Sequence, residues 1–171
     1  MTGPLYKNRD HKSCRICQFP LNAYSSFVYN FVGFYFYNIF PIISFSLFIL
    51  GIVSFFWWSY QRYKIQCIDL GIITYLYGWC LINYLELNSF QEFVILHSCI
   101  LSIFVFNKVY LKSLHILLIF LSVVVLIKTF NILPIFLFIL AGYCKFNIDY
   151  IGTMLFHIIS AFTIFVLLNN L

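Results

Sequence analysis

Charged residues are scarce in this chain of 171 residues. Asp, Glu, Lys and Arg together make up 9% of it, whereas soluble domains carry roughly 25%. Ten basic and five acidic side chains cannot give a protein of this size the polar surface that water requires. With 63% hydrophobic residues and a mean hydropathy of +0.97, the composition excludes a soluble globular domain and a disordered chain.

The chain also lacks a concentrated basic surface, although its net charge is +5. Four of the basic residues, Lys7, Arg9, Lys12 and Arg15, lie near the N-terminus, and the others are scattered between apolar runs. This scatter is typical of charges that orient membrane helices and not of a phosphate-binding face. We therefore expect no nucleic-acid partner.

Two further features of secreted proteins are missing. The six cysteines are spread along the chain without the spacing of a disulfide framework. The N-terminal segment has no apolar core of the kind found in a cleaved signal peptide. We expect free, buried thiols and a first membrane helix that acts as the targeting signal.

Long apolar stretches, in contrast, are abundant. A helix needs about 20 residues to cross the roughly 30 Å of hydrocarbon in a bilayer. Pro41 and Pro134 interrupt two runs that are too long for one crossing, because proline disfavours helix immediately before itself. The sequence therefore predicts an all-α fold, an integral membrane bundle of seven transmembrane helices. The seven stretches are 22–38, 41–60, 67–84, 90–107, 112–130, 132–144 and 151–168.

The basic residues orient this predicted bundle. With seven spans, the N-terminal tail and alternate loops share one side of the membrane, and Lys128 is the basic residue that lies on the other side. The positive-inside rule assigns the side of the tail to the cytoplasm. We expect a basic juxtamembrane tail over 1–19 and one seven-helix transmembrane domain over 20–171, with the C-terminus opposite the tail.

Polar residues inside the predicted spans are the candidates for function, because ionisable groups in a membrane are costly. Ser54 lies near the end of the second span, Asp69 opens the third and His157 lies near the start of the seventh. All three lie at a similar level, close to the side of the tail, as does His115 at the start of the fifth span. Such a cluster either forms a site or joins the helices by hydrogen bonds.

Four blocks in this order resemble the alkaline ceramidase family, in the superfamily that includes the progestin and adipoQ receptors. The second block is similar to a Gly-x-x-Ser-x-x-x-His pattern, and the first contains Asn22 and Ser25. The blocks are PLNAYSS at 20–26, GIVSFFWW at 51–58, IDLG at 68–71 and TMLFHIISAF at 153–162. The resemblance covers the first three predicted helices and the last.

The resemblance implies metal-dependent hydrolysis of a lipid amide, with a membrane lipid as the substrate. In that family three histidines bind zinc, and a serine and an aspartate complete the site, which maps onto His157, Ser54 and Asp69 here. Trp58 and Thr153 stand at the positions of the other two histidines. Tryptophan cannot bind zinc and threonine is a poor ligand.

Three functional hypotheses follow from these residues. In the first, the chain is an active ceramidase-like hydrolase in which His115 replaces a lost zinc ligand. In the second, it is a catalytically inactive relative with a lipid-binding or regulatory role. Ser54, Asp69 and His157 then form a hydrogen-bonded network between the helices. In the third, it is a small membrane subunit of a larger complex.

Overall fold

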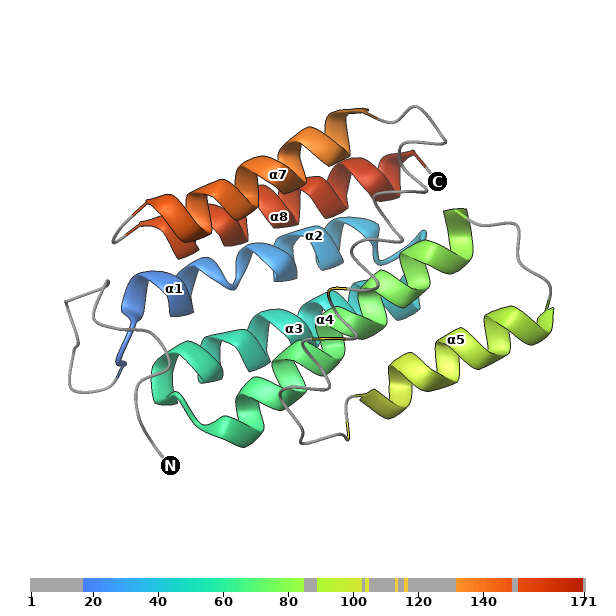
Figure 1. Cartoon of the computed structure of the whole chain (residues 1–171), viewed down its shortest axis with the longest axis horizontal. Coiled ribbons are helices and arrows are strands. Elements are labelled where there is room, and N and C mark those ends of the chain that lie inside the picture. The colour runs from blue at the N-terminus through green and yellow to red at the C-terminus, as the bar shows by residue number, and fades with distance from the viewer. Residues whose placement is uncertain are drawn as a thin grey trace.

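Helices make up most of the described part of the chain. A computed structural model of the protein describes residues 17–84, 89–102, 104, 113, 116, 132–148 and 151–170. No strand occurs among these residues, which confirms the all-α prediction. The tail residues 1–16, most of the predicted helix over 112–130 and His115 lie outside them. The helices, labelled as in Figure 1, are α1 (Pro20–Ser25), α2 (Val28–Phe36), α3 (Pro41–Tyr60), α4 (Tyr63–Tyr84), α5 (Ser89–Ser102), α7 (Ile132–Asn147) and α8 (Gly152–Asn169).

Prolines lie in the first turns of two helices whose starts the sequence predicts. The Phe36 carbonyl at the end of α2 accepts the backbone N–H of Ile39 at 3.0 Å, and α3 then begins at Pro41. Proline suits a first turn because the amide hydrogen that it lacks would have no partner within the helix. α7 likewise begins at Ile132, with Pro134 in its first turn. Both predicted starts are confirmed.

The first predicted span, 22–38, is not one helix but two. Ser26 and Phe27 divide it, because their amides bond to carbonyls only three residues back, at 3.2 Å each. Bonds of this spacing tighten a helix into a 3₁₀ turn. The hydroxyl groups of Ser25 and Ser26 both donate to the Asn22 carbonyl, at 3.0 and 2.9 Å. Local serine hydrogen bonds of this kind compete with the regular helical pattern.

A short turn at Gln61 and Arg62 joins α3 to α4. Gln61 adopts a left-handed conformation with φ of 51°, and its N–H donates to the Trp57 carbonyl at 2.8 Å. The left-handed residue ends α3 and reverses the chain, so α3 and α4 pack as antiparallel neighbours. Ser54 lies as far before this turn as Asp69 lies after it, which brings the two to the same level.

The helices contact one another in a simple order (Figure 1). α7 packs on α8, α8 packs on α1 and α2, and both of these pack on α3, which contacts α4, and α4 contacts α5. The ends of α3 and α7 and the starts of α1, α4 and α8 gather at one end of the bundle, at the left of Figure 1. Residues from five helices can therefore meet at this end.

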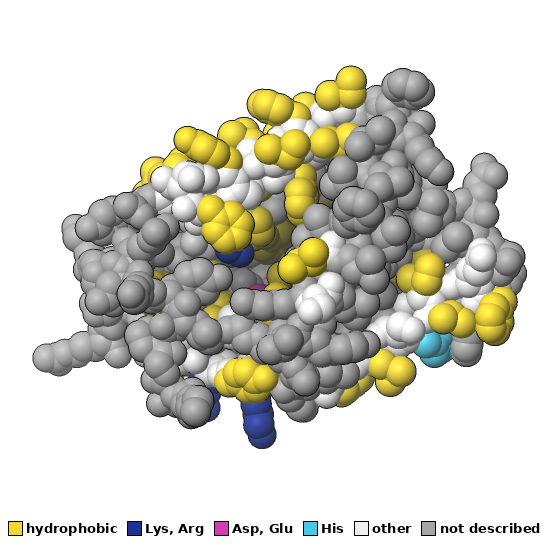
Figure 2. Space-filling model, in the orientation of Figure 1, with side chains coloured by type: hydrophobic (Ala, Val, Ile, Leu, Met, Phe, Trp, Pro, Cys, Tyr) yellow, Lys and Arg dark blue, Asp and Glu magenta, His cyan; other side chains and the backbone are white. Residues whose placement is uncertain are grey.

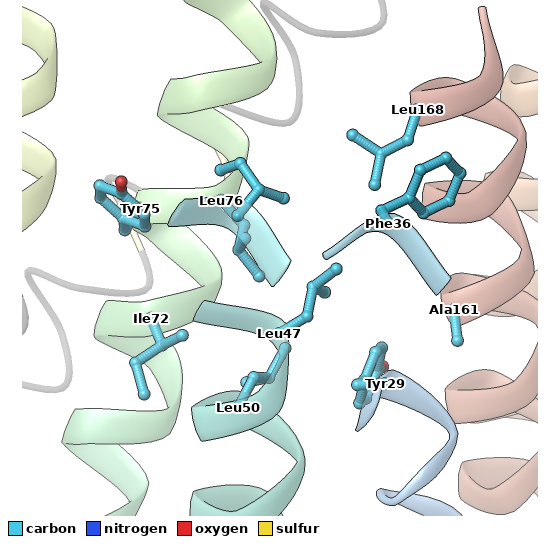
Figure 3. Close-up of a cluster of buried hydrophobic side chains, with 10 residues drawn as sticks. Tyr29, Phe36, Leu47, Leu50, Ile72, Tyr75, Leu76, Ala161 and Leu168 are labelled. Carbon is cyan, nitrogen blue, oxygen red and sulfur yellow. The ribbon is translucent and has the colours of Figure 1, made fainter. Parts of the chain in front are cut away.

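An apolar core joins α2, α3, α4 and α8 (Figure 3). Gly33 lets α2 and α3 approach closely, because a Cβ there would lie 2.6 Å from the Ser44 carbonyl oxygen and 3.2 Å from Leu47 Cβ. Small residues allow such close contacts between membrane helices. The core residues are Tyr29, Phe36, Ile43, Leu47, Leu50, Ile72, Tyr75, Leu76, Ala161 and Leu168.

The described exterior carries many large apolar side chains, and several polar side chains are buried. The side chains of Phe31 and Phe34 are 75% and 81% exposed, and Figure 2 shows apolar side chains over much of the described surface. An exterior of this kind fits a lipid environment. The buried polar residues are Asn22, Ser26, Ser44, Ser54, Ser59, Gln66, Asp69, Thr74, His157, Ser160 and Thr163.

Two helices in the described part of the chain, Pro41–Tyr60 and Gly152–Asn169, are long and apolar enough to cross a membrane. The sequence predicts seven spans, whereas the described helices support two. α7 is apolar but has 16 residues, α5 has 14, and the first predicted span is divided between α1 and α2. α4 has 22 residues, but its tyrosines, Asp69 and Asn83 lower its hydropathy.

Candidate functional site

Five polar residues gather at the end of the bundle where α1, α4 and α8 begin. We name them the polar cluster: Asn22 and Ser25 of α1, Ser54 of α3, Asp69 of α4 and His157 of α8. Ser25 is half-buried and the other four are buried. In Figure 2 the surface has a hollow in which an acidic and a basic side chain are visible. Asp69 is the one acidic residue whose side chain the structure describes.

The Ser54 and Asp69 side chains are hydrogen-bond partners across the α3–α4 turn. Ser54 is 3% exposed and Asp69 is 7% exposed. The Oδ1 atom of Asp69 is buried and has no hydrogen-bond partner in the described part of the chain. A buried acceptor without a donor costs about 1–3 kcal/mol. Asp69 thus presents an acceptor that a hydrogen-bond donor on a ligand can satisfy.

The Ser25 and His157 side chains connect α1 to α8, with 2.8 Å between Ser25 Oγ and His157 Nδ1. The single Ser25 hydroxyl proton is donated to the Asn22 carbonyl at 3.0 Å, and His157 also hydrogen-bonds to the Asn22 backbone. Ser25 and the Asn22 backbone together hold the His157 ring between α1 and α8.

Trp58 packs against His157, at the position where the resemblance expects a histidine. Its side chain is 4% exposed, and its ring centroid lies 6.0 Å from that of His157 and 5.9 Å from that of Phe19. An indole offers no lone pair to a metal ion. Thr153, at the other expected histidine position, is half-buried one turn before His157 on α8.

Tyr29 and Ser160 extend the polar cluster toward the core, and the sequence did not single them out. The Ser160 hydroxyl donates to the Phe156 carbonyl at 2.6 Å, so the Tyr29 hydroxyl donates to Ser160 Oγ, also at 2.6 Å. The Tyr29 ring centroid lies 5.9 Å from that of His157. Tyr29 follows Ser25 by four residues and Ser160 follows His157 by three, so helical spacing alone could have placed them on the same faces.

Lys145 is a third residue near the polar cluster, and the sequence assigned it only a role in orientation. It is half-buried in the last turn of α7, and its Nζ lies 4.1 Å from the centroid of the Phe156 ring. The sequence contained a signal for this position, because Lys145 lies just before the turn that leads into the helix with His157.

The residues of the polar cluster offer a metal ion one imidazole and one carboxylate. Among the residues that the structure describes, no group of three or more His, Cys, Asp and Glu could hold a metal, whereas catalytic zinc takes three protein ligands. His97 is exposed on α5, and the proposed replacement ligand His115 lies outside the described residues. The described residues do not fit the zinc site that the resemblance implies.

Comparisons with protein-family models, with curated proteins and with solved structures find no match for this chain. The likeness to ceramidases consists of the four sequence blocks and of the residues that they contribute to the polar cluster.

Proposed function

We propose that this chain is a ceramidase-like integral membrane protein, a bundle of seven transmembrane helices that binds the polar end of an amide lipid. The observation that carries this proposal is the pairing of Ser54 with Asp69 and of Ser25 with His157 at one end of the bundle. These residues come from four helices, and each lies in one of the blocks that resemble alkaline ceramidases.

The membrane environment is supported by the apolar exterior and by the two helices that are long enough to span a bilayer. Arg62 and Lys64 follow α3, and Lys145 lies in the last turn of α7. These basic residues belong to the same end of the bundle as the polar cluster (Figure 1). The positive-inside rule then makes this end, and the N-terminal tail, cytoplasmic.

The lipid class follows from the hydrogen-bonding groups of the polar cluster. Asp69 Oδ1 is a buried acceptor without a hydrogen-bond partner among the described residues, so the ligand needs an N–H or O–H donor. An amide lipid with hydroxyl groups near its amide has such donors next to its acyl chains. A hydrogen bond to a charged acceptor contributes about 1.5–3 kcal/mol, which favours a lipid that donates to Asp69.

Photocrosslinking tests this binding site. We would place the protein in lipid nanodiscs with an amide lipid that carries a photoactivatable group near its amide, and map the labelled peptides by mass spectrometry. Labels are expected in α1, α3 and α8. Asp69→Asn is expected to reduce labelling about tenfold, because it weakens a charge-assisted hydrogen bond.

Thr163→Val is the matched control. Thr163 is buried on α8 and its hydroxyl donates to the Ile159 carbonyl, beyond the polar cluster. This variant should be labelled like the wild type. Equal labelling of all variants, or labels spread evenly over the exterior helices, would contradict the proposed site.

Metal-dependent hydrolysis of the lipid amide is the second candidate, and the pairing of Ser54 with Asp69 is the observation that favours it. It requires ligands beyond the polar cluster, with His115 as the first candidate. Release of fatty acid from an amide lipid, abolished by both His157→Ala and His115→Ala, would support this activity. Labelling without any release would support binding alone.

A further inference from the structure

The three residues before α1, which we name the clasp, bind to the last turn of α3. The Gln18 N–H donates to the Ser59 carbonyl at 3.1 Å. The Phe19 N–H donates to the Trp58 carbonyl at 3.2 Å. Cys17, which is 4% exposed, adds a hydrogen bond of 3.3 Å between its Sγ and Ser59 Oγ. Because the last carbonyls of a helix have no partner within it, these bonds complete the end of α3 and fix the clasp against it.

The clasp also holds the side chain of Trp58. The Phe19 ring meets the Trp58 ring edge to face, with 5.9 Å between centroids and 81° between planes, an arrangement that aromatic pairs prefer. The Trp58 side chain is buried in a second apolar cluster, to which Cys17 and Ala23 also belong. Phe19 thus binds Trp58 twice, once at its carbonyl and once at its ring.

Trp58 in turn packs against the imidazole of His157. Their ring centroids lie 6.0 Å apart, with 63° between the planes. The ring of Tyr29 approaches the same imidazole at 5.9 Å and 64°, and Ser25 Oγ lies 2.8 Å from its Nδ1. The buried His157 ring therefore contacts two aromatic rings and is bound at one edge by a hydroxyl.

The aromatic contacts decide the orientation of the His157 ring. A single hydrogen bond to Ser25 lets an imidazole pivot, since the χ2 torsion of histidine has broad minima. Tyr29 is anchored on α8 itself, through its 2.6 Å bond to Ser160. Trp58 belongs to α3 instead and is anchored by the clasp. How the ring lies relative to α3 therefore depends on where the clasp places Trp58.

We propose that Trp58 is a positioning residue, which the clasp holds against His157 so that the imidazole has its binding orientation before a ligand arrives. A side chain that is already immobilised favours binding, because the ligand does not have to order it. For the identity of the ligand this proposal rests on the proposed function, whereas the fixed orientation of the ring does not. The resemblance treats Trp58 as a lost metal ligand, and its contacts give it a role of its own.

NMR of the histidine ring tests the orientation without any amide lipid. We would embed the full chain, with histidine isotope-labelled at Cε1, in nanodiscs of phosphatidylcholine and assign the His157 signal by its loss in His157→Ala. The order parameter of the Cε1–H bond should be about 0.8 or higher in the wild type. Trp58→Leu should lower it to about 0.6 or broaden the signal by slower exchange, and Trp58→Phe, which keeps an aromatic ring, should restore most of the order.

Trp79→Leu is the matched control, because it removes an indole from α4 that packs on Phe40 at 5.7 Å and not on His157. It should leave the His157 signal unchanged. A His157 signal that is equally ordered and equally sharp in Trp58→Leu would overturn the proposal. If Trp58→Leu does not fold, Phe19→Leu decides: a loosened His157 ring supports the role of the clasp, and an unchanged ring overturns it.

Lipid binding supplies the second readout. The concentration of photoactivatable amide lipid that gives half-maximal labelling should rise about fivefold in Trp58→Leu, since binding must then order the ring. It should stay close to the wild-type value in Trp58→Phe and Trp79→Leu. Equal values for Trp58→Leu and the wild type would overturn the proposal. Absence of labelling in the wild type, with a His157 ring whose order depends on Trp58, would instead overturn the proposed function alone.

Discussion

At the end of the bundle where α8 begins, helices meet through the pairs Ser54–Asp69 and Ser25–His157. At the other end, the same α3, α4 and α8 meet with α2 through apolar side chains such as Phe36, Leu76 and Leu168 (Figure 3). In the membrane environment that we propose, burying a leucine brings little hydrophobic gain, so close packing would mainly hold the apolar end. Hydrogen bonds between membrane helices average about 0.6 kcal/mol. The apolar end should therefore carry more of the stability, and the polar end more of the function.

The largest expected effect is at the closest approach in the apolar end. Gly33→Val would drive a side chain into the Ser44 carbonyl, which lies 2.6 Å from the position of a Cβ, and the helices α2 and α3 would have to separate. We expect a loss of about 3 kcal/mol in the free energy of unfolding, measured by detergent-induced unfolding of the purified protein.

Gly142→Ala is the control for this change, because a Cβ at Gly142 would meet nothing within 4 Å. It should be neutral or slightly stabilising, since alanine favours helix. Equal losses at both glycines would mean that the contact between α2 and α3 contributes nothing specific.

Removal of core volume should have the next largest effect. Leu47 is 0% exposed, and Leu47→Ala would leave a cavity between α3 and its neighbours. We expect a loss of about 2 kcal/mol in the free energy of unfolding, because the packing term remains even where the transfer term from water is absent. The matched change Phe45→Ala should cost little in the same unfolding assay, because the Phe45 side chain on α3 is 64% exposed.

A smaller loss is expected where the polar end meets the core. Tyr29→Phe removes the hydroxyl that donates to Ser160 Oγ at 2.6 Å and leaves the ring in place. The free energy of unfolding should fall by about 0.6 kcal/mol. Tyr35→Phe, which changes a 61% exposed tyrosine of α2, is the control. A loss at Tyr29 as large as that of Leu47→Ala would reverse the proposed division between the two ends.

The smallest change in stability is expected for Ser25→Ala, since this side chain is only half-buried. His157 would nevertheless lose its 2.8 Å partner and with it a fixed ring orientation. Labelling by the photoactivatable amide lipid should fall about threefold or more. Ser46→Ala, which removes a hydroxyl bonded to the Ile42 carbonyl, should leave labelling unchanged.

The sequence predicts the helices best where a backbone signal marks their ends. The range 41–60 agrees with α3 at both ends, because Pro41 starts the helix and the chain reverses immediately after Tyr60. The break between Ser25 and Val28 was missed, because a run of apolar residues does not reveal that serine hydroxyls will bond to a nearby carbonyl. Hydropathy alone also predicts more membrane spans than the described helices support.

For the candidate site, sequence reasoning identified residues at equal depth but not the bonds between them. Ser54 and Asp69 follow from the α3–α4 turn, since both lie equally far from it. The side-chain hydrogen-bond partner of His157 is Ser25. The sequence analysis named Ser25 only as part of the block at 20–26. Lys145 was counted as an orienting charge, because its reach across to α8 depends on how α7 and α8 pack.

The exposed aromatic exterior should determine which substitutions the protein tolerates at its surface. Positions such as Phe31 and Phe34 need only remain apolar, so phenylalanine, leucine and isoleucine can replace one another there without loss of fit to lipid. A charge at the same positions would be costly at membrane depth. The exterior should therefore tolerate exchange among apolar residues, whereas the buried polar residues should tolerate few changes.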